Sequence, residues 1–60
     1  SKQPIDVQMQ YVDSMLQTLN EYASYECTTP TAQVLWLDRI QFQLDYFERL
    51  KDQLKVSTAL

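Results

Sequence analysis

The side chains in this sequence that could do chemistry are its carboxylates and a single thiol, because the chain contains no histidine. Without histidine there is no usual base for a serine or cysteine nucleophile, and without glycine there is no glycine-rich loop to bind phosphates. Cys27 lies near the expected end of a helix, which disfavours a thiolate, so we interpret it as a small apolar filler or a turn residue. These observations predict a protein that is not an enzyme and that holds no metal and no cofactor.

Three carboxylates are regularly spaced, because Asp38, Asp45 and Asp52 recur every seven residues and so share one face of a helix. We interpret this face as the solvated side of an amphipathic helix. The alternative is an acidic ladder that meets a basic partner, with steps of about 10.5 Å at the helical rise per residue. Residues 41–45 share only Leu44 and Asp45 with the Ser-Gln-Glu-Leu-Asp motif of small helical hairpins that dephosphorylate sporulation response regulators. A match of two residues does not support membership of that family.

The length of the chain limits how it can be stabilised. Sixty residues make one domain, near the lower limit for a self-sufficient core. Scaffolds of this size usually need disulfides, a metal or association. An internal disulfide is excluded by the single cysteine and a metal is disfavoured by the absence of histidine, so association is the stabiliser we expect.

The charge balance disfavours two classes of partner. Eight acidic against five basic residues give a formal net charge of −3, which argues against binding nucleic acid or an anionic membrane. The longest apolar run covers residues 34–37, far short of the roughly 20 residues that span a bilayer. No signal-peptide pattern opens the sequence, and one unpaired cysteine favours a reducing environment. We therefore expect a cytoplasmic protein with no membrane, nucleic-acid or small-molecule partner.

The pattern along the chain predicts an all-α fold. A helix is expected over about residues 4–26, because Pro4 suits a first turn and Asp6 favours the helix dipole there. A turn is expected at 27–30, where Thr29 caps a second helix that begins at Pro30 and runs to about residue 56. The short connection predicts an antiparallel helical hairpin forming a single domain over residues 1–60.

Each predicted helix carries an apolar stripe with roughly heptad spacing, and the two stripes are expected to face each other as the core. In the first helix the stripe consists of Ile5, Met9, Val12, Leu16, Leu19 and Ala23. In the second it consists of Trp36, Leu37, Ile40, Leu44, Phe47, Leu50 and Leu54. On the surface, Asp45 and Arg49 are predicted to pair at i,i+4.

The second helix has more apolar side chains than one neighbouring helix can cover. Leu35, Phe42 and Tyr46 fall about 100–140° away from Phe47, so the apolar arc is about 220° wide where about 100° would suffice. The residues predicted to contact a partner, with arginines at the rim, are Tyr11, Met15, Tyr22, Leu35, Arg39, Phe42, Tyr46 and Arg49. The partner is expected to be a second copy that completes a four-helix bundle. A different protein, or no partner for these scattered surface aromatics, is the alternative.

The function expected from these features is that of a small regulator, adaptor or assembly factor acting through an apolar helix face. Two alternatives remain at this stage. One is a regulator that contributes the Asp45 carboxylate to the chemistry of a partner enzyme. The other is a structural segment of a larger assembly, which would not fold stably alone.

Overall fold

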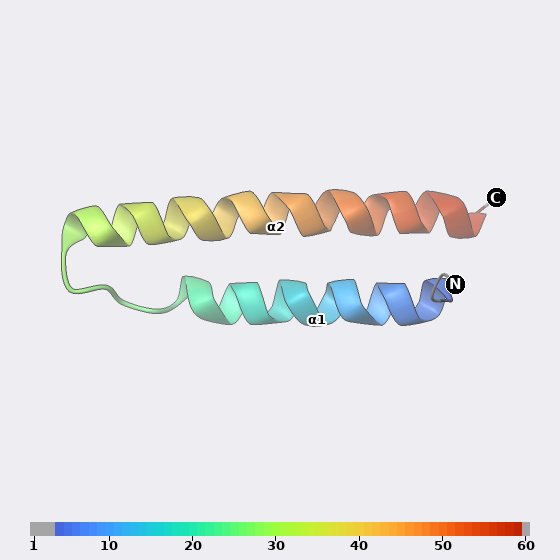
Figure 1. The fold of residues 1–60 in the computed structure, drawn as a ribbon, viewed down its shortest axis with the longest axis horizontal. Coiled ribbons are helices and arrows are strands. Elements are labelled where there is room, and N and C mark those ends of the chain that lie inside the picture. Colours follow the sequence, from blue (N-terminus) through green and yellow to red (C-terminus); the bar gives the residue numbers. More distant parts are fainter. Residues whose placement is uncertain (1–3, 60) are drawn as a thin grey trace.

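The fold is a pair of antiparallel helices joined by a short loop (Figure 1). The computed structural model describes the backbone of residues 4–59 and the side chains of residues 4–57. Helix α1 covers Ile5–Ala23 and helix α2 covers Pro30–Ala59, with lengths of 19 and 30 residues. The predicted all-α architecture is confirmed over residues 4–59, which contain no strand.

The end of α1 comes earlier than the predicted position near residue 26. Ser24 donates from its N–H and its hydroxyl to the Glu21 carbonyl, at 3.2 and 2.6 Å, and Tyr25 N–H donates to the Tyr22 carbonyl at 3.1 Å. Such bonds to the third preceding residue tighten the last turn and supply partners for carbonyls that a helix end leaves free. The α-helix therefore ends at Ala23.

The start of α2 agrees with its sequence signal. Thr29 Oγ1 accepts a hydrogen bond from Ala32 N–H at 3.1 Å, and the Thr29 carbonyl accepts one from Gln33 N–H at 3.0 Å. This is the geometry of an N-cap before a first-position proline. At its other end α2 continues to Ala59, three residues beyond the predicted position, in a segment with neither glycine nor proline to stop it.

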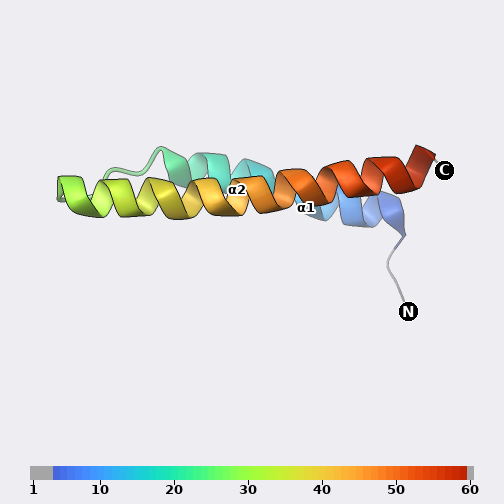
Figure 2. The same ribbon diagram turned by 90° about the horizontal axis from the view of Figure 1, so that it is seen from above.

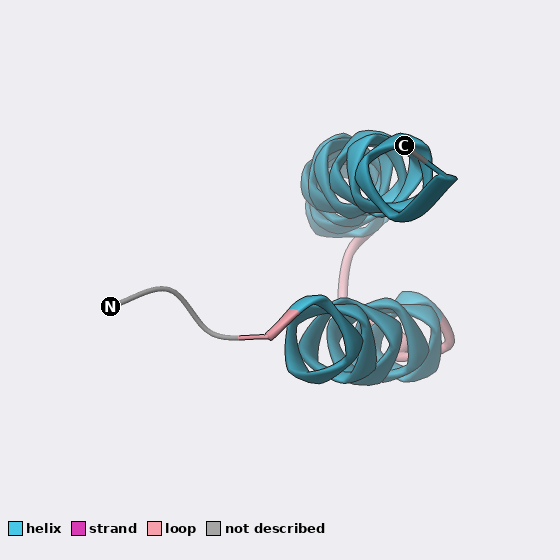
Figure 3. Cartoon of the chain, turned by 90° about the vertical axis from the view of Figure 1, so that its right-hand side faces the viewer, coloured by secondary structure: helices cyan, strands magenta, loops and turns pink. Residues whose placement is uncertain are grey.

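The molecule is a rod only two helices thick. Its principal extents are 46 × 18 × 15 Å, and the two helices lie side by side along most of α1 (Figures 2 and 3). The buried core consists of Val12, Leu19, Ile40 and Leu54. Because neither helix has a second neighbour, only the facing stripes are shielded from water, and the flanks of both helices remain exposed.

Leu37 does not belong to the core, which corrects the predicted stripe. Its side chain is 43% exposed, whereas Ile40 three residues later is buried. Trp36 and Ile40 occupy successive turns that face α1, and at 100° per residue Leu37 is then turned about 60° away from Ile40. A single neighbouring helix does not reach that flank.

Candidate protein-interaction face

One flank of α2 presents large apolar side chains to solvent. Leu35, Phe42 and Tyr46 are 65%, 72% and 54% exposed. They project on the side predicted from their spacing, because the stripe that contains Ile40 and Phe47 is occupied by the contact with α1. This flank is the part of α2 that a hairpin alone cannot cover.

Helix α1 extends the same surface across the hairpin. Tyr11 and Tyr22 are 60% and 39% exposed. Tyr11 packs edge-on against Phe47 with ring centroids 6.5 Å apart, and Phe47 packs edge-on against Tyr46 at 5.1 Å. This chain of ring contacts connects α1 to the exposed flank of α2.

A shallow apolar groove lies between the helices on this surface. It encloses about 300 Å³ and is lined by Val7, Gln8, Tyr11, Val12, Leu50 and Leu54. Val7 was not predicted as a contact residue, although it stands four residues before Tyr11 and so lies on the same flank of α1. We call the exposed residues Val7, Tyr11, Tyr22, Leu35, Phe42 and Tyr46 the apolar face.

Met15 lies deeper than the other predicted contact residues. Its side chain is half-buried, while Tyr11 four residues earlier is exposed. On the helical wheel Met15 falls between the core position of Val12 and the flank occupied by Tyr11. Met15 therefore lies at the boundary between the core and the apolar face.

The loop end of the face is fixed by side chains of α2. Trp36 Nε1–H donates to the Tyr22 carbonyl at 2.8 Å, and the Trp36 ring stacks on Tyr25 with centroids 6.4 Å apart and an angle of 11°. Gln33 accepts from Cys27 N–H at 2.7 Å and donates to the Tyr25 carbonyl at 3.2 Å. The loop is therefore held in place, and Tyr22 keeps its position beside Trp36.

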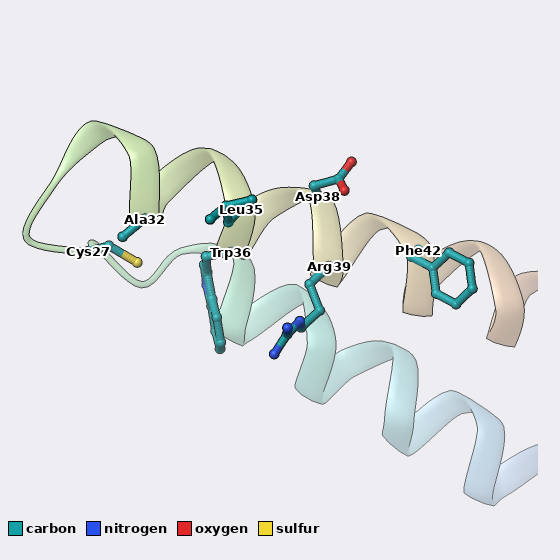
Figure 4. Close-up of a pocket in the computed structure, with 7 residues that line it drawn as sticks. All are labelled: Cys27, Ala32, Leu35, Trp36, Asp38, Arg39 and Phe42. Carbon is teal, nitrogen blue, oxygen red and sulfur yellow. The ribbon is translucent and has the colours of Figure 1, made fainter.

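A second depression lies where the face meets this loop. It encloses about 570 Å³ and is lined by Cys27, Ala32, Leu35, Trp36, Asp38, Arg39 and Phe42 (Figure 4). In Figure 4 the Arg39 and Trp36 side chains extend from α2 in a similar direction, while Phe42 projects from the next turn. The depression is a continuation of the apolar face, because Leu35 and Phe42 belong to both.

Two arginines lie on and beside the face. Arg39 is exposed, and it makes no hydrogen bond or ion pair with any residue in the described part of the chain. The predicted Asp45–Arg49 ion pair is wrong: Arg49 Nε donates to the Asp45 backbone carbonyl at 3.3 Å, and the Asp45 carboxylate accepts from Gln41 Nε2 at 2.9 Å. Both guanidinium groups therefore keep most of their donors available.

The acidic side chains of α2 form a stripe that borders the apolar face, and Asp38 also lines the depression near the loop. Asp38, Asp45 and Asp52 are exposed, as expected for a solvated side. One ion pair crosses between the helices, with Lys51 Nζ 2.7 Å from Asp13 Oδ1. Among the residues that the structure describes, no three His, Cys, Asp or Glu side chains gather in a way that could hold a metal ion.

Neither α1 nor α2, over the residues described, is long and apolar enough to cross a membrane. Comparison with known proteins finds no matching family model, no matching curated protein and no matching solved structure. A functional proposal for this chain therefore rests on its fold and on the chemistry of the apolar face.

Proposed function

We propose that this chain is a non-enzymatic protein–protein interaction module, and that its partner is a second copy of itself. The observation that carries the proposal is the apolar face: six large side chains from both helices, 39–72% exposed, on a hairpin too thin to cover them. Two hairpins stacked through these faces form a four-helix bundle with twofold symmetry. A cytoplasmic setting fits this role, since the only cysteine is unpaired.

The size of the face supports a stable contact. An aromatic side chain offers roughly 150–250 Å², so the exposed parts of the four aromatics with Leu35 and Val7 amount to on the order of 600 Å². The largest apolar patch on a typical monomeric protein is also about 300–600 Å², but a typical monomer is much larger than this chain. A standard interface buries about 800 Å² on each partner, which the face and its rim would supply.

A second copy is the occupant that the composition of the face favours. An isologous contact places the same surface on both sides, so each copy covers the apolar face of the other. The aromatic-rich composition with arginine at the rim is also typical of interface cores.

Sedimentation equilibrium of the wild type, of Phe42→Asp and of Val34→Asp tests the proposal. Val34 is a matched control, because it is a similarly exposed apolar residue of α2, at 67%, but is turned about 80° away from Phe42 and about 100° away from Leu35 on the helical wheel. The wild type and Val34→Asp should both sediment at twice the 7.1 kDa monomer mass at low micromolar concentration. Phe42→Asp should sediment as a monomer at that concentration, because it removes the most exposed ring of the face and takes a carboxylate out of water, a cost that one neighbouring guanidinium does not offset.

Circular dichroism of each variant shows whether it is still helical at the concentration used. A wild-type chain that is monomeric up to millimolar concentration would overturn the proposal. So would a Phe42→Asp variant that dimerises like the wild type, or a Val34→Asp variant that dissociates as completely as Phe42→Asp while both remain helical.

A further inference from the structure

Helix α2 carries two seams of heptad spacing, and only one of them is used within the hairpin. The inner seam packs on α1 and includes Trp36, Ile40, Phe47 and Leu54. The second seam, which we call the outer seam, consists of Leu35, Arg39, Phe42, Tyr46, Arg49 and Gln53, all exposed. Alternating steps of four and three residues are the pattern of a helix that packs along a second helix at a small crossing angle.

The arginines of the outer seam decide how two copies can pair. If the α2 helices ran parallel around a twofold axis, Arg39 would meet Arg39 of the second copy at the same level, and Arg49 would meet Arg49. If they ran antiparallel with the axis at residue 44, Phe42 would meet Tyr46 of the second copy, but Arg39 would meet Arg49. Like charges brought together in an interface cost several kcal/mol, so both arrangements are disfavoured.

A shift of one heptad removes the conflict. With the axis between residues 40 and 41, Arg39 lies against Phe42 of the second copy and Leu35 lies against Tyr46. A guanidinium over an aromatic ring is attracted by the negative face of the ring, and Arg39 has no hydrogen bond or ion pair among the described residues to give up. The opposite shift places Arg39 against Val56 and Phe42 against Gln53, so that only Tyr46 faces an arginine, Arg49.

We propose that the two copies pair through antiparallel α2 helices, with Arg39 of each stacked on Phe42 of the other and the loops at opposite ends of the bundle. This inference rests on the proposed self-association and adds its geometry. Arg39 then selects the register, because it attracts the aromatic ring in one register and repels Arg49 of the second copy in another.

Distances between nitroxide labels on the two copies test the register. Labels are placed at Lys55→Cys and, in a second sample, at Glu48→Cys, both in a Cys27→Ser background. Both positions are exposed and lie one heptad apart on the same side of α2. The component of the label–label distance perpendicular to the helix axes is therefore the same for both samples. In the proposed register the labels are separated along the helix axis by about 44 Å at 55 and about 22 Å at 48. The antiparallel register centred on residue 44 gives about 33 and 12 Å, and a parallel pair gives equal distances at both positions.

A charge reversal provides the decisive comparison. Arg39→Glu removes the attraction to the ring and creates an opposite-charge pair with Arg49 in the register centred on residue 44. We expect the axial separation at position 55 to shorten by about 10 Å, which is one heptad of helical rise. The matched control Arg49→Lys keeps the charge at the rim and should leave both distances unchanged.

Sedimentation equilibrium of the same labelled samples separates the two proposals. A monomer without dipolar coupling means that self-association itself fails. A dimer with the distances of another register, or a dimer whose distances do not change in Arg39→Glu, overturns the proposed pairing while the proposed function stands. A dimer with about 44 and 22 Å axial separations that shifts in Arg39→Glu supports it.

Discussion

Replacing Ile40 with alanine should cost far more stability than replacing Leu37, although both residues fit the apolar stripe of the sequence. Ile40 is 4% exposed and sits where α2 faces α1, so its truncation removes buried methylene groups and leaves a cavity, at a cost of about 2–4 kcal/mol. Leu37 is 43% exposed and leaves no enclosed cavity, so its truncation should cost about 1 kcal/mol or less.

The size of the Ile40 effect matters because the hairpin has little stability to lose. A chain of 60 residues, with four buried core side chains among those that the structure describes, is expected to have a free energy of unfolding of only about 3–5 kcal/mol from its core. Ile40→Ala should therefore lose most of its free energy of unfolding and unfold at a much lower urea concentration, whereas Leu37→Ala should stay close to the wild type.

Urea unfolding followed by circular dichroism measures both variants. All samples should have the same protein concentration, because self-association would couple the midpoint to concentration. If Leu37→Ala lowers the midpoint as much as Ile40→Ala, then α2 is rotated relative to the structure described here and the core assignment is refuted.

Three further changes probe the contacts that shape the hairpin. Thr29→Ala removes the cap of α2 and should lower the free energy of unfolding by about 1 kcal/mol in urea titrations, while the control Thr31→Ala, one residue inside α2, should cost less than half as much. Trp36→Phe removes one hydrogen bond but leaves the accepting carbonyl with its second donor, so we expect a loss of about 1 kcal/mol and faster amide exchange in the loop at 24–29. Lys51→Met breaks the ion pair with Asp13; because the Lys51 and Asp13 side chains are 31% and 54% exposed, the free energy of unfolding should fall by less than about 1 kcal/mol in urea titrations, and by less still in high salt.

The apolar face shows which properties of a residue local periodicity can predict. The spacing of Leu35, Phe42 and Tyr46 placed them off the core stripe, and the structure leaves all three exposed. The same method placed Met15 with the exposed tyrosines, whereas its side chain is half-buried. A helical wheel gives the angle of a residue on its own helix, but the depth at which that residue sits depends on how the facing helix is rotated and offset.

One helix end was predicted correctly from the sequence and another was not. Thr29 followed by Pro30 identified the start of α2, because a capping side chain and a residue without N–H act within one turn of sequence. The end of α1 was predicted three residues too late. Its final carbonyls are satisfied in part by Trp36, a side chain fourteen residues away along the chain.

The sequence by itself therefore determined the number of helices, the position of the loop and the presence of an apolar surface too wide for one neighbour. These properties follow from capping, proline and the 3.6-residue period, which act between residues a few positions apart. Only the tertiary structure decided that Leu37 leaves the core, that Lys51 pairs with Asp13 and that Gln33 and Trp36 hold the loop. Those outcomes depend on the register between two helices, and the register is fixed only when side chains distant in sequence pack against one another.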